Sequence, residues 1–115
     1  MLSINTEIRK GILFVRLVGD LNKHTVDTFN EEVTSMVKDN GISNIVFNFN
    51  ELNAIDMKGI NALFYNYELV NNNNGKTLIC NMSNNRVKHR INNSRLLNYM
   101  NEVSDELTAF NTFNL

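Results

Sequence analysis

The sequence has one cysteine, no proline and no tryptophan, and it lacks an apolar run long enough to cross a membrane. Cys80 alone cannot form an internal disulfide, so the cysteine content gives no support to secretion. A membrane-spanning helix needs about 20 consecutive apolar residues. The first residues, MLSINTEIRK, also lack the apolar region of a signal peptide. These absences favour a cytoplasmic protein.

An excess of charge of either sign is also missing. The 115 residues include 11 Lys and Arg against 12 Asp and Glu, which gives a formal net charge of −1. This balance provides no bulk electrostatic reason to expect binding to nucleic acid or to a membrane surface. We also expect no direct insertion into a membrane, because no apolar run is long enough. A chain of this length with 43% hydrophobic residues is typical of one soluble domain, which we expect to span residues 1–115.

Asparagine is the one residue type in large excess. It occupies 23 positions, whereas alanine occupies three. Codon bias in an AT-rich genome would produce this composition without any functional pressure. A prion-like segment is disfavoured because the asparagines are scattered between periodic apolar runs.

The first quarter of the chain predicts a β-hairpin. Apolar and polar residues alternate over residues 2–9, as in a half-buried strand. Lys10-Gly11 permits a tight turn into residues 12–18, a nearly continuous apolar run typical of a central strand. We expect Gly19 to end that strand.

The remainder alternates between helical and strand periods. Apolar residues at helical spacing predict helices over residues 26–37 and 60–70, and a third around 84–92. Strands are expected at 45–49 and 77–80, with a short edge strand at 99–103. Ser104 is the expected cap of a last helix that turns Leu107 and Phe110 inward. The order ββαβαβα(β)α predicts an α/β fold: a mixed, mostly parallel sheet of four to five strands with about four helices packed on it.

The sequence gives little support to catalysis. Cys80 lies in an apolar strand pattern without a nearby histidine, which is typical of a small core residue. The two histidines, His24 and His89, lack the spacing of metal ligands, and there is no phosphate-binding glycine motif. We therefore predict no catalytic residue, no metal site and no cofactor.

One segment is distinctly basic. Residues 69–101 contain five Lys and Arg and no acid. A helix carrying Arg86, Lys88, His89 and Arg90 is compatible with RNA, anionic lipid or an acidic protein surface. A solvated helix face is the simpler interpretation, and the absence of interleaved aromatic residues weakens the nucleic-acid alternative. The role of the segment from Arg86 to Arg95 stays open at this stage.

The most informative segment is residues 52–60, which lead from the end of a predicted parallel strand into a helix. Ligands and partners of α/β sheets are commonly met at such positions, where the helix presents unpaired N–H groups. Asp56 is well placed to cap this helix. Lys58 is a cation in the first turn, which costs about 0.3–1 kcal/mol. An unfavourable cation at a helix start suggests a functional role for Lys58. The alternative is an exposed lysine whose side chain turns into solvent and has no functional role.

Two motifs in this order of elements resemble the STAS domain of bacterial anti-sigma-factor antagonists. Gly19-Asp20-Leu21-Asn22 is similar to the G-E-L-D of that family, and Asp56-Met57-Lys58-Gly59 is similar to its D-S-S-G or D-S-T-G. Val87-Lys88 and the acidic start of the last helix also look similar. The resemblance covers essentially the whole chain and implies a binding protein, not an enzyme. Its family members bind an anti-sigma factor that is also a serine kinase, and phosphorylation of the second Ser/Thr in the motif ends that interaction.

The sequence departs from this family at the decisive position. Lys58 stands in place of the phosphoacceptor, Met57 replaces the preceding serine, and Asn22 replaces an acidic residue. No Ser or Thr occurs between Ser43 and Thr77. The resemblance therefore implies an anti-sigma-factor-binding module without the usual switch. Its expected partner-binding residues are Asn22, Lys23, His24, Asp56, Met57, Lys58, Gly59 and Ile60.

Two alternatives stay open. A STAS domain can also serve as a scaffold in a larger signalling assembly or as an accessory subunit of a lipid transporter. The second alternative is a small enzyme or nucleotide-binding protein that acts at the same strand-to-helix loop. The oligomeric state and the partner's identity are not predicted.

Overall fold

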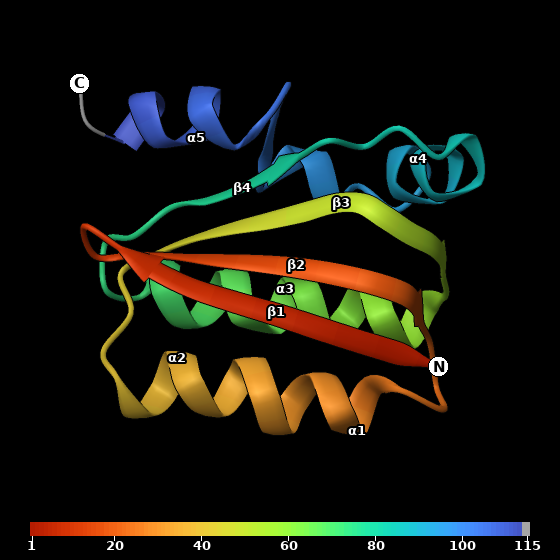
Figure 1. Ribbon diagram of the computed structural model, residues 1–115, viewed down its shortest axis with the longest axis horizontal. Coiled ribbons are helices and arrows are strands. Elements are labelled where there is room, and N and C mark those ends of the chain that lie inside the picture. The colour runs from red at the N-terminus through yellow and green to blue at the C-terminus, as the bar shows by residue number, and fades with distance from the viewer. Residues whose placement is uncertain (114–115) are drawn as a thin grey trace.

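The computed structural model describes residues 1–113, in which five strands form one mixed sheet in the order β1-β2-β3-β4-β5 (Figure 1). The β1–β2 pair is antiparallel and every other pair is parallel. Lys10 and Gly11 have φ angles of +53° and +79°, as the tight hairpin turn requires. The strands are β1 (Leu2–Arg9), β2 (Ile12–Leu21), β3 (Asn44–Ile55), β4 (Thr77–Cys80) and β5 (Asn101–Val103).

Helices fill each connection after the hairpin, and the predicted order ββαβαβα(β)α is confirmed. A π-helical turn, η1, interrupts the first helical segment between α1 and α2. The helical elements are α1 (Val26–Phe29), η1 (Asn30–Thr34), α2 (Ser35–Asp39), α3 (Met57–Asn71), α4 (Asn85–Asn92), the 3-10 turn η2 (Leu96–Asn98) and α5 (Glu106–Phe113).

The sheet is covered on both faces, which explains the continuous apolar run of β2. Leu13, Val15 and Leu17 belong to the main core, together with buried residues of α1 to α4. Ile12 and Phe14 point to the other face and belong to a smaller core beneath α5. Figure 1 shows α1, α2 and α3 on one side of the sheet and α5 on the opposite side.

Strand β2 is longer than predicted, and Gly19 does not end it. The strand continues to Leu21 through register shifts around Gly19. Gly19 has a φ of +109°, and a Cβ atom there would lie 2.2 Å from the carbonyl oxygen of Met1. Glycine is therefore required because the N-terminal backbone approaches the strand closely, not because the strand stops.

The last helix also begins differently from the prediction. Asp105, rather than Ser104, caps α5, because its Oδ1 accepts a 2.8 Å hydrogen bond from the Thr108 N–H. This bond holds the pKa of Asp105 below its ordinary value. Leu107 is consequently 68% exposed, which contradicts its predicted inward position. The inward face is instead formed by Glu106, Ala109, Phe110 and Phe113.

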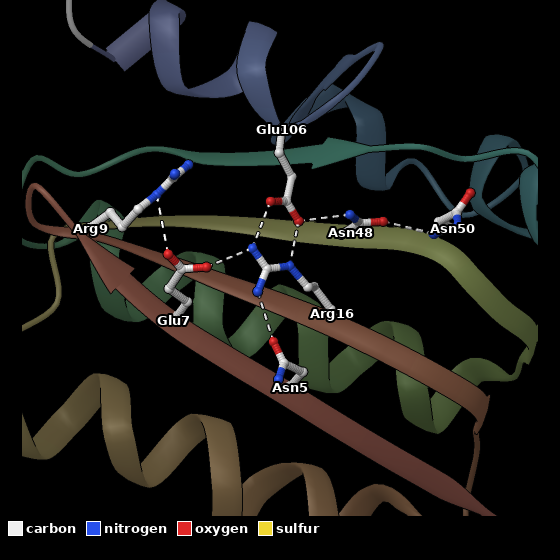
Figure 2. A network of polar contacts seen from close by, with 7 residues as sticks. All are labelled: Asn5, Glu7, Arg9, Arg16, Asn48, Asn50 and Glu106. Atoms are coloured by element: carbon white, nitrogen blue, oxygen red, sulfur yellow. Dashed lines mark hydrogen bonds and ion pairs between the residues drawn. The ribbon is translucent and has the colours of Figure 1, made fainter.

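A polar network anchors α5 to the sheet (Figure 2). Arg16 of β2 donates to both carboxylate oxygens of Glu106 at 2.8 Å, and also to Glu7 and Asn5 of β1. Asn48 of β3 donates to Glu106 at 2.8 Å. The hydrogen bond from Arg16 holds the pKa of Glu106 below its ordinary value of 4.5, against the opposing effect of burial. The Glu106 carboxylate thus joins α5 directly to β2 and β3, and Arg16 extends the network to β1.

Glu106→Gln is expected to lower the free energy of unfolding by about 1 kcal/mol at pH 7. The neutral Gln amide replaces the carboxylate, and the charge-assisted hydrogen bonds from Arg16 are lost. A carboxylate with a depressed folded pKa contributes stability that is present above pH 4.5 and is lost as the pH falls through its folded pKa. The variant should therefore lose less stability than the wild type below pH 4.5. Urea unfolding at a series of pH values measures this difference. Glu102→Gln, at an exposed residue of β5, is the matched control, and equal losses in both variants would show that the network contributes nothing.

Candidate functional site

The site lies at the edge of the sheet where the parallel strands β2, β3 and β4 end. Residues 22–25 follow β2, Asp56 follows β3, and Asn84 precedes α4. Asn84 caps α4 by accepting hydrogen bonds from the N–H groups of Arg86 and Val87. The N-termini of α3 and α4 therefore lie at one edge of the sheet, beside the loop that follows β2.

Asp56 joins the β2–α1 loop to the start of α3. Its Oδ1 accepts a 2.9 Å hydrogen bond from the Gly59 N–H, which confirms the predicted cap. Its Oδ2 accepts a second 2.9 Å bond from the Lys23 N–H. The Asp56 N–H in turn donates to the carbonyl of Leu21 at 3.2 Å. The loop and the helix start are therefore held as one unit.

The environment of Asp56 favours its ionised form. Burial is the largest single influence and opposes ionisation, but it is outweighed by the N–H groups of Gly59, Lys23 and Lys58 together with the charge of Arg90. The pKa of Asp56 consequently lies below its ordinary value of 3.8. The carboxylate keeps its charge, and hence both links, throughout the neutral pH range.

The β2–α1 loop is ordered by its own side chains. The Asn22 Oδ1 accepts from the His24 N–H at 2.8 Å. The Thr25 Oγ1 accepts from the Asn22 N–H at 2.9 Å and donates to the Asp20 carbonyl at 2.8 Å. The sequence did not predict Thr25 as part of the site, although Asn and Thr side chains commonly hydrogen-bond to nearby backbone in turns. These bonds fix the backbone that presents Lys23 and His24.

Gly59 and Ile60 lie beneath the exposed residues of the site, and Ile60 lines the hollow beside them. Both are buried, so they support the exposed residues instead of extending them. A Cβ atom on Gly59 would lie 2.6 Å from the Leu21 carbonyl oxygen and 2.9 Å from side-chain atoms of Leu21 and Ile55. The first turn of α3 can approach the end of β2 this closely only because residue 59 lacks a side chain.

The other predicted residues form an exposed ridge. Lys23, His24, Met57 and Lys58 are exposed, with Met57 at 56%. Lys58 stands in the first turn of α3, next to the loop that Asp56 holds, as the sequence predicted. Within residues 1–113 Lys58 makes no ion pair. Asn22 and Asp56 are half-buried at the base of the ridge.

The described residues offer little reactive chemistry. Cys80 is fully buried, and desolvation, assisted by the charges of Glu106 and Asp105, raises the pKa of its thiol to about 12. Such a thiol is a poor nucleophile at neutral pH. Over residues 1–113 no group of three or more His, Cys, Asp or Glu residues is arranged to hold a metal ion. Over the same range, no helix combines the length and hydropathy needed to cross a bilayer.

Comparison with known proteins identifies the family. Residues 3–113 match the STAS domain. The chain belongs to the STAS domain family. A relative of this STAS domain is the anti-sigma F factor antagonist of Paenibacillus polymyxa, which is 28% identical over 82 residues, covering 71% of this chain and 70% of the relative.

Solved structures share the fold of this STAS domain. An anti-sigma factor antagonist from Mycobacterium paratuberculosis superimposes with a TM-score of 0.88 at 13% identity, over 100% of this chain and 96% of the other. The Bacillus cell fate determinant SpoIIAA in its phosphorylated form superimposes with a TM-score of 0.74 at 19% identity, over 96% and 99% of the two chains. The predicted STAS-like α/β fold is thereby confirmed.

Proposed function

We propose that this STAS domain is an anti-sigma factor antagonist that binds an anti-sigma factor in the cytoplasm and thereby regulates sigma-dependent transcription. The binding surface is the ridge formed by Lys23, His24, Met57 and Lys58, with Asn22 and Asp56 at its base. The observation that carries the proposal is the pair of 2.9 Å bonds by which Asp56 holds the loop and the helix start together. A preformed surface loses little conformational entropy when it binds a partner.

The family membership and the P. polymyxa relative support an antagonist role. In the proposed interaction the anti-sigma factor is also a serine kinase, as the resemblance implies. The protein acts by occupying that partner and not by catalysis, in keeping with its inert thiol.

We further propose that the domain lacks the phosphorylation switch. Lys58 is an amine that a serine kinase cannot phosphorylate, and it places a fixed positive charge where a phosphate would place about −1.5 to −2. Among residues 22–25 of the β2–α1 loop, the one hydroxyl group is that of Thr25, which is 8% exposed and hydrogen-bonded to Asp20 and Asn22. Binding would then be constitutive with respect to this kinase.

Restoring a hydroxyl group at residue 58 tests both parts of the proposal. After incubation with ATP and the kinase anti-sigma factor of the same genome, Lys58→Ser should incorporate one phosphate and bind that factor at least about tenfold more weakly. The wild-type chain should incorporate none and keep its affinity. Mass spectrometry and calorimetry measure the two effects.

Lys88→Ser provides the control, because it removes an exposed lysine from α4 instead of α3. It should behave like the wild type. If Lys58→Ser takes up no phosphate and binds unchanged, the assignment of the surface is wrong. If the wild-type chain binds no anti-sigma factor, the proposed function is wrong.

A further inference from the structure

A groove of about 780 Å³ opens beside the ridge, between the end of β3, the start of α3 and the length of α4. Its floor is apolar and consists of Ala54, Ile55 and Ile60. Its lining residues are Ala54, Ile55, Met57, Ile60, Asn85, Arg86, His89, Arg90, Asn93 and Ser94.

The rim of the groove is positively charged and carries no acid. Arg86, His89 and Arg90 are all exposed along one side of α4. Within residues 1–113 neither arginine forms an ion pair. The charge of Arg90 acts on Asp56, but both oxygens of Asp56 already accept backbone hydrogen bonds. The guanidinium groups are therefore available to a carboxylate from outside.

The groove continues along α3. A second hollow of about 230 Å³ shares Met57, Ile60 and Ser94 with the first and extends to Phe64 and Tyr99. Met57 and Tyr99 are 56% and 52% exposed. The two hollows together offer an apolar track with arginines beside it, which suits a peptide segment better than a single small molecule.

We infer that this groove binds an acidic segment of the partner protein, in which apolar side chains enter the floor and flanking carboxylates pair with Arg86 and Arg90. The inference rests on the proposed function and names the chemistry of the partner segment. Charge complementarity carries it: an apolar floor beside two arginines that form no ion pair within residues 1–113 matches carboxylates interleaved with apolar residues.

The same features disfavour the other partners compatible with a basic helix. Bound single-stranded RNA stacks its bases on aromatic side chains. No Phe, Tyr or Trp lines the larger hollow beside Arg86 and Arg90. Phe64 and Tyr99 line only the smaller hollow, where their rings pack edge to face against each other. An anionic membrane surface would be met by a convex basic face, whereas Arg86 and Arg90 border a concavity and Lys88 does not line it.

A peptide probe tests the groove without the partner. The probe is a twelve-residue peptide that repeats Glu-Glu-Leu-Glu, and its control carries Lys in place of Glu. Amide chemical shifts of the full chain should change at Ala54, Ile60 and Arg90 with the acidic probe and not with the basic one. Arg86→Glu and Arg90→Glu should each weaken this binding about tenfold or more. Lys88→Glu, which makes the same charge change on the same helix, should have less than a twofold effect.

Three results would overturn the inference: no shift changes at the groove, an equal loss in Lys88→Glu, or tighter binding of poly(U) RNA or phosphatidylglycerol vesicles than of the acidic peptide. Titration with the anti-sigma factor separates this inference from the proposed function. If the partner binds wild type, Arg86→Glu and Arg90→Glu equally, the groove proposal fails and the proposed function stands. If the peptide results hold but no anti-sigma factor binds, the groove stands as an acidic-segment site and the proposed function fails.

Discussion

Asp56→Ala is expected to unfold with a free energy about 2 kcal/mol below that of the wild type. The change removes the cap of α3, which is worth about 1 kcal/mol, and a charge-assisted bond to the Lys23 N–H of similar worth. The β2–α1 loop should then separate from the helix start. Amide hydrogen exchange should accelerate at Lys23 and Gly59, and affinity for the anti-sigma factor should fall more than tenfold.

Two variants make this result specific. Asp56→Asn keeps a side-chain oxygen at the cap and should retain most of the stability. Asp27→Ala removes an exposed carboxylate from the first turn of α1 and should change stability by less than about 0.5 kcal/mol. If Asp56→Ala binds the partner as tightly as the wild type does, the loop and the helix start do not act as one surface.

Gly59→Ala should lower the free energy of unfolding by about 2 kcal/mol, although alanine within a helix normally gains about 1 kcal/mol over glycine. The reversal arises because the new Cβ would lie 2.6 Å from the carbonyl oxygen of Leu21. Either α3 must move away from β2 or the Asp56 links must stretch. Urea unfolding measures the loss.

Asn61→Ala is the matched control, since residue 61 is exposed on the same helix. It should leave stability unchanged or raise it by about 0.5 kcal/mol. A Gly59→Ala variant that is as stable as the Asn61→Ala variant would show that the helix start tolerates a side chain. The close approach of α3 to β2 would then not be a constraint on the site.

Much of the fold could be predicted because apolar periodicity reports burial. The alternation over residues 2–9 and the continuous run of β2 correspond to strands covered on one face and on both. The cap at Asp56 was also predictable, because the carboxylate precedes a helical period directly. Local signals of this kind depend on neighbouring residues alone.

Local patterns fail where groups distant in the sequence determine the local structure. The local pattern predicts that Gly19 ends a strand, but residue 19 must be glycine because the Met1 backbone lies close to it, which no local pattern reveals. The cap of α5 was misplaced by one residue because Ser104 and Asp105 are both good caps. Glu106 must face Arg16 of β2, and this contact selects Asp105 and leaves Leu107 exposed.

The sequence predicted the position of Lys58 and of the Asp56 cap, but not the shape of the surface around them. The sequence placed Lys58 in a first turn, whereas the burial of Gly59 and Ile60 depends on the approach of α3 to β2. The sequence shows that residues 69–101 are basic, but it does not predict a role for them. That role depends on the groove that α4 forms with the end of β3. The π-helical turn at Asn30–Thr34 was not predicted. Thr34 of this turn accepts a hydrogen bond from buried Asn66 of α3, a contact between residues distant in the sequence that no local pattern indicates.

The central claim is that the surface around Lys58 binds an anti-sigma factor and cannot be switched off by phosphorylation. Calorimetric titration of the wild-type chain with the kinase anti-sigma factor, before and after incubation with ATP, tests it most directly. We predict binding in both samples with dissociation constants that agree within about twofold. An absence of binding before ATP, or a loss of binding after it, would contradict the claim.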